Sequence, residues 1–269
     1  MEKTFAFIGA GNMGGAIVEA VCRAVDPKAV TVYDRDIEKI KALAEKTGCT
    51  AASDELKAVE GARYIFLCVK PKIEKLAISE IATALKGDKL VVSIAAGTTV
   101  ESVRGMLQEN GVDLPVVRLM PNTPVAAGKG LILMARDGRV SDADVSALCE
   151  ALAPGGMVEP VDESLIDAAT PVFSCSPAYV YMFIESLADG GVMAGLPRDK
   201  AQRFAAQAVL GSAAMVLETG KHPGELKDAV CSPGGSTIVG VEALEKAGFR
   251  GAIASAVYEA YIKTVSLGK

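Results

Sequence analysis

The sequence has a single histidine, no excess of basic over acidic residues and no C-x-x-C pair among its six cysteines. A zinc site is hard to assemble from these residues, so we expect no metal ion. The formal net charge of −5 leaves no surplus of lysine and arginine to neutralise phosphates. This argues against nucleic acid or an anionic membrane surface as a partner, and it favours small molecules as ligands.

Long hydrophobic runs are also absent. The apolar stretch at residues 5–8 is too short for a signal peptide. The longest apolar segment near the middle, residues 178–184, is far shorter than the roughly 20 residues that span a bilayer. Together with the scattered cysteines, which suit reduced thiols, these features predict a cytoplasmic protein without a membrane anchor.

The chain nevertheless has ample material for two hydrophobic cores. It is 269 residues long, and 50% of its residues are hydrophobic. Over residues 1–163, short β-branched runs alternate with amphipathic stretches, which is typical of βαβ units. We therefore expect a Rossmann-type parallel sheet with helices on both faces, in an α/β protein. The predicted strands are residues 4–8, 30–33, 64–69, 90–94, 116–119, 131–135 and 157–161.

Residues 164–269 show a different pattern, in which strand signals give way to long helical stretches. We predict helices at residues 178–194, 198–218, 237–247 and 251–266. Several are apolar over most of their circumference, and such surface is unfavourable in water by about 25 cal/mol per Å². The sequence therefore predicts an all-α C-terminal domain that pairs with a second copy, giving a homodimer or a larger assembly of such dimers.

A glycine-rich turn follows the first predicted strand and opens a helix. Its residues are Gly9, Gly11, Asn12, Met13 and Gly14. Glycines at this spacing allow a tight turn and let a pyrophosphate approach the free N–H groups of the helix. The pattern is weak by itself, since an ordinary strand-to-helix turn can also be glycine-rich. The preceding strand and the following helix favour a dinucleotide site.

Two charged residues at the end of the second predicted strand bear on the cofactor. Asp34 stands 20 residues after Gly14, where a carboxylate accepts hydrogen bonds from the adenosine ribose of NAD. Arg35 is suited instead to the 2′-phosphate of NADP. Both are also common as solvated turn residues. The choice between NADH and NADPH stays open at this point.

Further candidates lie at the carboxyl ends of later predicted strands, which is the edge where ligands bind in open α/β sheets. Two prolines bracket Asn122, so its amide is a candidate for positioning a nicotinamide ring, although the segment is equally a plain turn. Lys70 is either a ligand contact or a solvated lysine. The residues expected to line the cofactor groove are Val69, Lys70, Pro71, Ala95, Ala96, Gly97, Pro121 and Asn122.

A second glycine-containing loop, Ser232-Pro-Gly-Gly-Ser-Thr237, precedes the predicted helix at 237–247. Its glycines expose backbone N–H groups, and the helix dipole favours an anion there. The alternative is a capped helix start without a ligand, because serine, threonine and glycine are favoured at helix N-termini.

Taken together, these motifs resemble the pyrroline-5-carboxylate reductase family over almost the whole chain. The segments that carry the resemblance are residues 7–14, 69–71, 93–97, 120–124, 226–228 and, most specifically, 232–238. The resemblance implies reduction of the cyclic imine 1-pyrroline-5-carboxylate to L-proline, the last step of proline biosynthesis. It favours NADPH as the cofactor, while Asp34 leaves NADH open.

The resemblance also assigns roles at the substrate end. Gly234, Gly235, Ser236 and Thr237 would hold the substrate carboxylate, with Lys70 as a further substrate contact. Thr237 would hydrogen-bond the ring nitrogen as a catalytic residue, and Ser232 would support it. No strong acid or base is required, since a protonated imine already carries the positive charge that a hydride neutralises.

Two alternatives remain. A hydroxyacid dehydrogenase of related architecture would need a catalytic lysine, yet no lysine or histidine lies between Lys129 and Lys200. A non-catalytic dinucleotide sensor is the other. It is suggested by residues 173–176, Phe-Ser-Cys-Ser, which replace the glycine-rich segment usual in the family.

Overall fold

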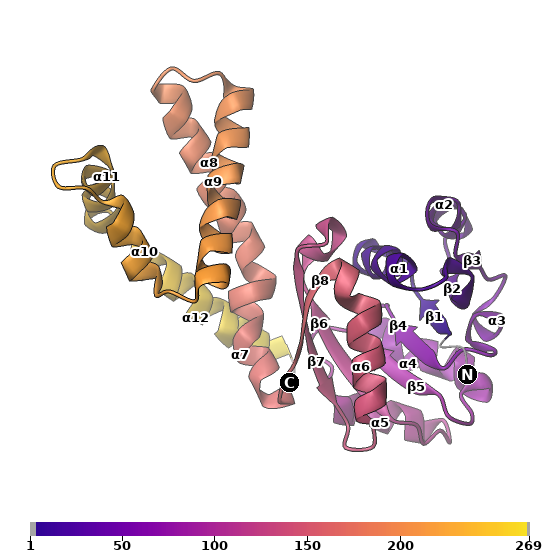
Figure 1. Ribbon diagram of the computed structural model, residues 1–269. Coiled ribbons are helices and arrows are strands. Elements are labelled where there is room, and N and C mark those ends of the chain that lie inside the picture. Colours follow the sequence, from indigo (N-terminus) through magenta and orange to yellow (C-terminus); the bar gives the residue numbers. More distant parts are fainter. Residues whose placement is uncertain (1–3, 268–269) are drawn as a thin grey trace. The chain divides into compact units, whose positions relative to one another are not determined.

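The computed structural model describes residues 4–267, and the chain divides into two compact units (Figure 1). Within the described residues, the first unit comprises 4–174 and 261–267, and the second comprises 175–260. The two compact units therefore divide after Ser174, whereas the domain division predicted from the sequence lies after residue 163. The physical reason is that the segment 163–173 packs against the sheet: Ile166 and Phe173 share a buried cluster with Met120 and Leu133.

The first unit is built on a sheet of eight strands among the described residues, in the order β3-β2-β1-β4-β5-β6-β7-β8. All neighbours are parallel except β6 and β7, which are antiparallel. The expected parallel sheet is confirmed, while the antiparallel pair and the short β3 escaped prediction. The strands are β1 Phe5–Ile8, β2 Val30–Tyr33, β3 Thr50–Ala51, β4 Tyr64–Leu67, β5 Leu90–Ser93, β6 Val116–Pro121, β7 Gly130–Arg136 and β8 Gly156–Pro160.

Helices cover both faces of this sheet, because alternate residues of each strand are apolar on both sides. In β1, Phe5 and Phe7 face a core formed with α1, α2 and α6, whereas Ala6 and Ile8 face a core formed with α3, α4 and α5. The helices are α1 Asn12–Ala24, α2 Ile37–Thr47, α3 Glu55–Val59, α4 Pro71–Ile81, α5 Val100–Glu109, α6 Asp142–Leu152 and α7 Ile166–Thr170. A π-helix, Pro171–Cys175, follows α7.

The second unit is helical. Its complete helices are α8 Ser176–Met193, α9 Arg198–Thr219, α10 Pro223–Val230 and α11 Ser236–Lys246. The last helix, α12 Phe249–Leu267, belongs to this unit up to Ala260. Helices α8 and α9 pack against each other around Ala188, Ala201 and Ala205. Gly191 of α8 lies close to the neighbouring segment: a Cβ there would lie 3.3 Å from a Leu196 side-chain carbon and 3.4 Å from the Cβ of Ala201. The short α10 was not predicted.

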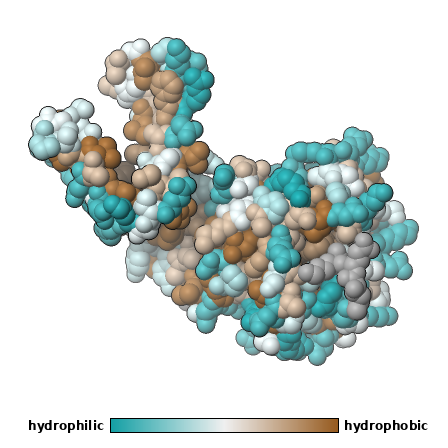
Figure 2. Space-filling model, in the orientation of Figure 1, coloured by the Kyte–Doolittle hydropathy of each residue, from teal (hydrophilic) through white to brown (hydrophobic). Residues whose placement is uncertain are grey.

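Apolar side chains remain exposed on this helical unit, and Figure 2 shows hydrophobic residues along its helices. Met193 is 90% exposed, Leu217 80% and Val230 65%. Among residues 4–267, no helix combines the length and apolar character required of a membrane span. The exposed apolar faces therefore need another explanation, and pairing between chains was the expectation from the sequence.

Candidate functional site

The glycine-rich turn between β1 and α1 is shaped by close backbone approaches. Gly9 has a φ of +103°, and a Cβ at this position would lie 2.6 Å from the carbonyl oxygen of Cys68. A Cβ on Gly14 would lie 2.6 Å from the carbonyl oxygen of Gly9. A Cβ on Gly11, in contrast, would meet nothing within 4 Å. Two glycines therefore serve the turn itself, whereas the third leaves space above the start of α1.

The start of α1 is open to an anion. Gly11 is the N-cap and contributes no side-chain hydrogen bond, and the first turn contains no acidic residue. The first N–H groups of a helix lack intrahelical partners and carry a positive partial charge. With Asn12 exposed at the first helical position, these amides suit a pyrophosphate. The residues present therefore fit a dinucleotide.

Asp34 closes the same turn from the end of β2. Its Oδ2 accepts a hydrogen bond from the backbone N–H of Ala10 at 2.6 Å, and its Oδ1 accepts one from the N–H of Asp36 at 2.9 Å. Both oxygens thus already accept backbone hydrogen bonds, although each keeps a further lone pair. Asp34 has a structural role in addition to any contact with a ribose.

A cavity of about 200 Å³ lies beside Asp34, at the carboxyl ends of β1, β2 and β4. Arg35 borders it and pairs with Glu80 of α4 at 2.9 Å. This combination of an apolar wall and an arginine suits an adenosine that carries a 2′-phosphate. The lining residues are Ile8, Gly9, Tyr33, Asp34, Arg35, Val69, Ile73, Ala77 and Glu80.

Two other predicted segments reach the same edge of the sheet. Lys70 is exposed and is the N-cap of α4, with Pro71 at the first helical position. After β5, Ala95 is buried, while Ala96 and Gly97 are exposed and Gly97 has a φ of +80°. Both segments thus border the carboxyl edge beside the glycine-rich turn, as expected of a cofactor groove.

Asn122 behaves differently from the expectation. Its side-chain Nδ2 donates to the carbonyl oxygen of Phe173 at 2.8 Å, and its Oδ1 accepts from the N–H of Leu131 at 2.9 Å. The side chain is 8% exposed. The amide that was expected to position a nicotinamide therefore also joins the end of β6 to β7 and to the π-helix, and it keeps a second N–H group. Pro121, just before it, is buried as the last residue of β6.

The Ser232–Gly235 loop in the second unit joins α10 to α11, and like the turn before α1 it precedes a helix N-terminus. Gly234 has a φ of +71°, and the N–H of Gly235 donates to the carbonyl oxygen of Ser232 at 3.0 Å. Gly235 is the N-cap of α11 without a side-chain hydrogen bond, and the first turn contains no acidic residue. Ser236 and Thr237, both exposed, are the first two helical residues. This helix start also suits an anion such as a carboxylate.

The single histidine has a local role. His222 is the N-cap of α10, and its Nδ1 accepts a hydrogen bond from the N–H of Gly224 at 3.0 Å. His222 therefore stabilises a helix start. Within residues 4–267, no group of three or more histidine, cysteine or acidic side chains is arranged to hold a metal ion.

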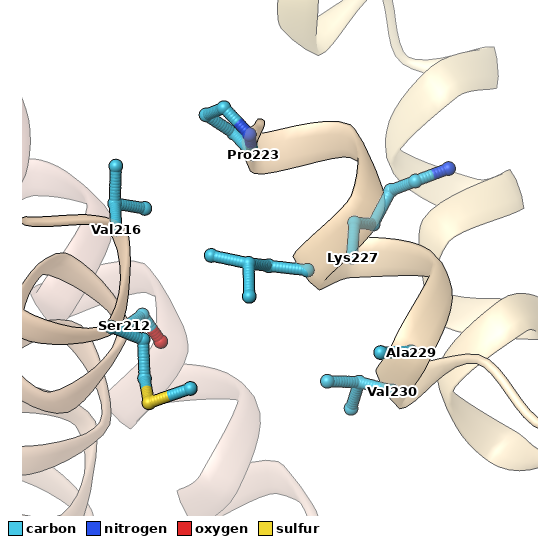
Figure 3. Close-up of a pocket in the computed structure, with 8 residues that line it drawn as sticks. Ser212, Val216, Pro223, Lys227, Ala229 and Val230 are labelled. Atoms are coloured by element: carbon cyan, nitrogen blue, oxygen red, sulfur yellow. The ribbon is translucent and has the colours of Figure 1, made fainter. Parts of the chain in front are cut away.

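An apolar groove of about 430 Å³ lies between α9 and α10, and Figure 3 shows its walls. Ser212 and Val216 lie on α9, and Ala229 and Val230 on α10, with Lys227 at the edge. The remaining lining residues are Met215, Pro223 and Leu226. A predominantly apolar groove open to solvent is typical of a surface that another chain covers.

Residues missed from the sequence include Glu74, which is fully buried beside Ser93, and Glu80, which pairs with Arg35. A signal for Glu74 was present: it shares the helical spacing of Ala77, Ile78 and Ile81, all buried on one face of α4. A carboxylate on an apolar helix face indicates a specific role.

Two family models match the chain. Residues 163–267 match the model described as pyrroline-5-carboxylate reductase dimerisation. Residues 4–97 match the model described as NADP oxidoreductase, coenzyme F420-dependent. The helical region and the glycine-rich turn thus fall under separate models.

Known proteins resemble the chain over its full length. A pyrroline-5-carboxylate reductase from Escherichia coli is 43% identical, with 100% of both chains covered. One from Pisum sativum is 40% identical, covering 96% of this chain and 93% of the relative. Among solved structures, the Plasmodium falciparum pyrroline carboxylate reductase with NADP bound has a TM-score of 0.87 and 30% identity, covering 100% of this chain and 99% of the other.

Proposed function

This chain belongs to the pyrroline-5-carboxylate reductase family, and on that basis we propose that it reduces 1-pyrroline-5-carboxylate to L-proline with NADPH. The observation that carries the proposal is a pair of open helix N-termini, one at α1 and one at α11. Neither has a side-chain cap or an acidic residue in its first turn. One suits the pyrophosphate of a dinucleotide and the other suits the carboxylate of the imine.

At the substrate end, the backbone N–H groups around Gly235 and Ser236 bind the carboxylate, with Gly234 giving the loop its left-handed turn. The hydroxyl of Thr237 orients the ring nitrogen, and Ser232 supports the loop through its carbonyl contact with Gly235. Lys70, exposed at the start of α4, is a further candidate for the substrate carboxylate.

At the cofactor end, the turn from Gly9 to Gly14 binds the pyrophosphate, with Asn12 and Met13 in the first turn of α1. Val69, Pro71, Ala95, Ala96, Gly97 and Pro121 line the groove, while Asn122 shapes it through its contacts with Phe173 and Leu131. A bound dihydronicotinamide supplies a hydride to the imine carbon. Because the protonated imine is already positively charged, the chain needs to supply no strong acid.

NADPH is preferred over NADH in this proposal. The oxygens of Asp34 accept hydrogen bonds from Ala10 and Asp36, which weakens the case for it as a dedicated ribose acceptor. Arg35 borders the adenosine cavity and is exposed, so it can turn from Glu80 to a 2′-phosphate. An arginine and a phosphate form strong paired hydrogen bonds.

The C-terminal region is the dimerisation region of the family, and it supports homo-oligomerisation of this chain. We extend this to a domain of residues 164–269 that binds substrate and forms a homodimer, with larger assemblies built from such dimers. The groove between α9 and α10 supports this, because a second copy would cover its exposed Val230 and Met215. We further propose a cytoplasmic location.

The experiment is direct. Purified protein is incubated with 1-pyrroline-5-carboxylate and either NADPH or NADH, and the loss of dihydronicotinamide absorbance is followed together with proline formation. Turnover with NADPH at a lower KM than with NADH is expected. Cofactor binding without turnover would contradict the proposal and favour a dinucleotide sensor. Oxidation of hydroxy acids instead would favour a hydroxyacid dehydrogenase.

A further inference from the structure

Glu74 is an uncommon residue for its position, because it is a carboxylic acid with no exposed surface on the first turn of α4. The side chain is buried with Ala77, Ile78 and Ile81 on the face that packs on the sheet. Burying a carboxyl group is costly unless it is hydrogen-bonded, and burying its charge costs more. Such a residue needs a reason beyond packing.

The carboxyl group is connected to a turn through one serine. The Ser93 hydroxyl, at the end of β5, donates a hydrogen bond to Glu74 Oε1. The same Ser93 oxygen accepts a hydrogen bond from the N–H of Ala95 at 3.2 Å. The chain of donors thus runs from the backbone of Ala95 through Ser93 to Glu74. It links the start of α4 to the turn that ends at Gly97.

The second carboxyl oxygen of Glu74, Oε2, differs from Oε1 in its surroundings. Among the described residues, Glu74 Oε2 is buried without a hydrogen-bond partner. Burial raises the pKa of Glu74, and the hydrogen bond from Ser93 only partly offsets the rise. An ionised carboxylate would leave Oε2 charged and unsolvated, and relieving that would move the side chain away from Ser93.

The charged residues around Glu74 do not compensate it. They lie on α4 itself and on α3 and α5, which pack against it. Four of them form ion pairs with other side chains: Lys75 with Glu109 at 2.7 Å, Lys57 with Asp54 at 3.2 Å, Arg104 with Asp137 at 3.7 Å and Glu80 with Arg35 at 2.9 Å. Of the others, Lys72 and Glu101 are exposed and Glu55 is half-buried. Within residues 4–267, no opposite charge therefore favours the ionised form of Glu74.

The two segments that Glu74 joins are the same two that border the cofactor groove. One is Val69 to Pro71, which leads into α4, the helix that carries Glu74. The other is Ser93 to Gly97, which begins at the last residue of β5. We propose that Glu74 is a positioning residue for the dinucleotide, whose buried carboxyl group holds these two segments at a fixed separation through Ser93. This inference rests on the proposed cofactor role of both segments.

The test uses the full-length protein and measures the dissociation constant for NADPH by its fluorescence, without any imine. Glu74→Leu removes the acceptor of the Ser93 hydrogen bond and fills the same buried space with an apolar side chain. Ser93→Ala removes the connecting hydroxyl. Loss of one buried hydrogen bond predicts binding weaker by about tenfold in each. The double variant should bind no more weakly than the single ones, because both break the same connection.

Glu74→Gln distinguishes positioning from simple packing. It keeps an acceptor for Ser93 but cannot ionise, so NADPH affinity at neutral pH should stay within about twofold of wild type. In the wild type, affinity should fall as the pH rises through the pKa of Glu74, whereas the Gln variant should show no such fall. With imine and saturating NADPH, kcat should change little in the Leu variant while the KM for NADPH rises. Glu101→Gln, an exposed residue on α5, is the control.

The proposal is overturned if Glu74→Leu and Ser93→Ala bind NADPH like wild type, or if Glu74→Gln binds as weakly as Glu74→Leu. If Glu74→Leu fails to fold, Ser93→Ala carries the same test. Since the binding assay needs no substrate, an enzyme that binds NADPH but reduces no imine would contradict the proposed reaction without affecting this inference. Wild-type protein that binds no NADPH would contradict both.

Discussion

The sharpest contrast in the cofactor site lies between two glycines three residues apart, Gly11 and Gly14. In Gly14→Ala, the new methyl group would lie 2.6 Å from the carbonyl oxygen of Gly9 and 2.9 Å from Cys68 Cβ. Backbone must shift to relieve these contacts. Overpacking of this kind costs about 1–3 kcal/mol of folding stability. For a chain of this size, that corresponds to a fall in Tm of roughly 2–12 °C.

Gly11→Ala should behave in the opposite way. Gly11 has a φ of −61° and a ψ of −177°, which alanine adopts without strain, and a Cβ there meets no protein atom within 4 Å. Its stability should change by less than about 0.5 kcal/mol. The added methyl group instead occupies the space where we place the pyrophosphate. We expect NADPH binding to weaken by roughly tenfold or more, from lost contacts of at least about 1.4 kcal/mol.

The assay pairs thermal unfolding with NADPH titration, at one fixed protein concentration because oligomers unfold in a concentration-dependent way. The prediction is two separate phenotypes, with Gly14→Ala losing stability and Gly11→Ala losing cofactor affinity at an unchanged Tm. If Gly11→Ala bound NADPH normally, the N-terminus of α1 would not hold the pyrophosphate, and the role that we assign to the open start of this helix would be refuted.

Three further substitutions test other parts of the account. Thr237→Ala should lower kcat/KM for the imine by roughly 10- to 100-fold while leaving NADPH affinity near wild type; equal losses of both would contradict the assigned role. Val230→Asp, which places a charge in the groove between α9 and α10, should shift the protein toward monomer in sedimentation equilibrium, and an unchanged oligomer would remove that groove from the interface. Asn122→Ala removes hydrogen bonds to Phe173 and Leu131 and should lower the free energy of unfolding by about 1–3 kcal/mol, measured in urea; unchanged stability would show those bonds to be dispensable.

The titration of Glu74 predicts a pH dependence of stability as well. The pKa of Glu74 in the folded protein lies above the ordinary value of 4.5. Its contribution to the free energy of unfolding is therefore complete below pH 4.5. The contribution is lost as the pH rises toward and through the raised pKa. Urea unfolding from acidic to alkaline pH should therefore show Glu74→Gln gaining on the wild type as the pH increases. A constant difference between the two proteins would mean that Glu74 does not titrate with a raised pKa.

The sheet unit was largely predictable because its strands are short, buried runs whose apolar residues face both ways. β1, β2, β4 and β5 were found nearly to the residue, and β7 and β8 were correctly placed in the same sheet. What periodicity could not give was direction: β6 and β7 are joined by the short turn at Thr123–Ala127, which allows an antiparallel pair. The two-residue β3 carried too little pattern to detect.

Within the candidate site, the sequence could predict backbone turns, as at Gly9 to Gly14 and at Gly234, while the binding roles of these residues stay predictions. The site was less predictable where a side chain has competing partners. Asn122 was assigned to a cofactor, yet its partner Phe173 lies 51 residues away, in a segment that was assigned to the other domain. Only tertiary contacts reveal that Phe173 packs on the sheet, which is why the compact units divide after Ser174 and not at the residue where the helical pattern of the sequence begins.

The most direct measurement follows the hydride itself. NADPH carrying deuterium at both C4 positions of the dihydronicotinamide is incubated with the protein and 1-pyrroline-5-carboxylate, and the product is analysed by mass spectrometry and NMR. We expect proline with one deuterium on the ring carbon that neighbours nitrogen and does not bear the carboxylate. Proline without deuterium, or no proline despite bound cofactor, would contradict this expectation.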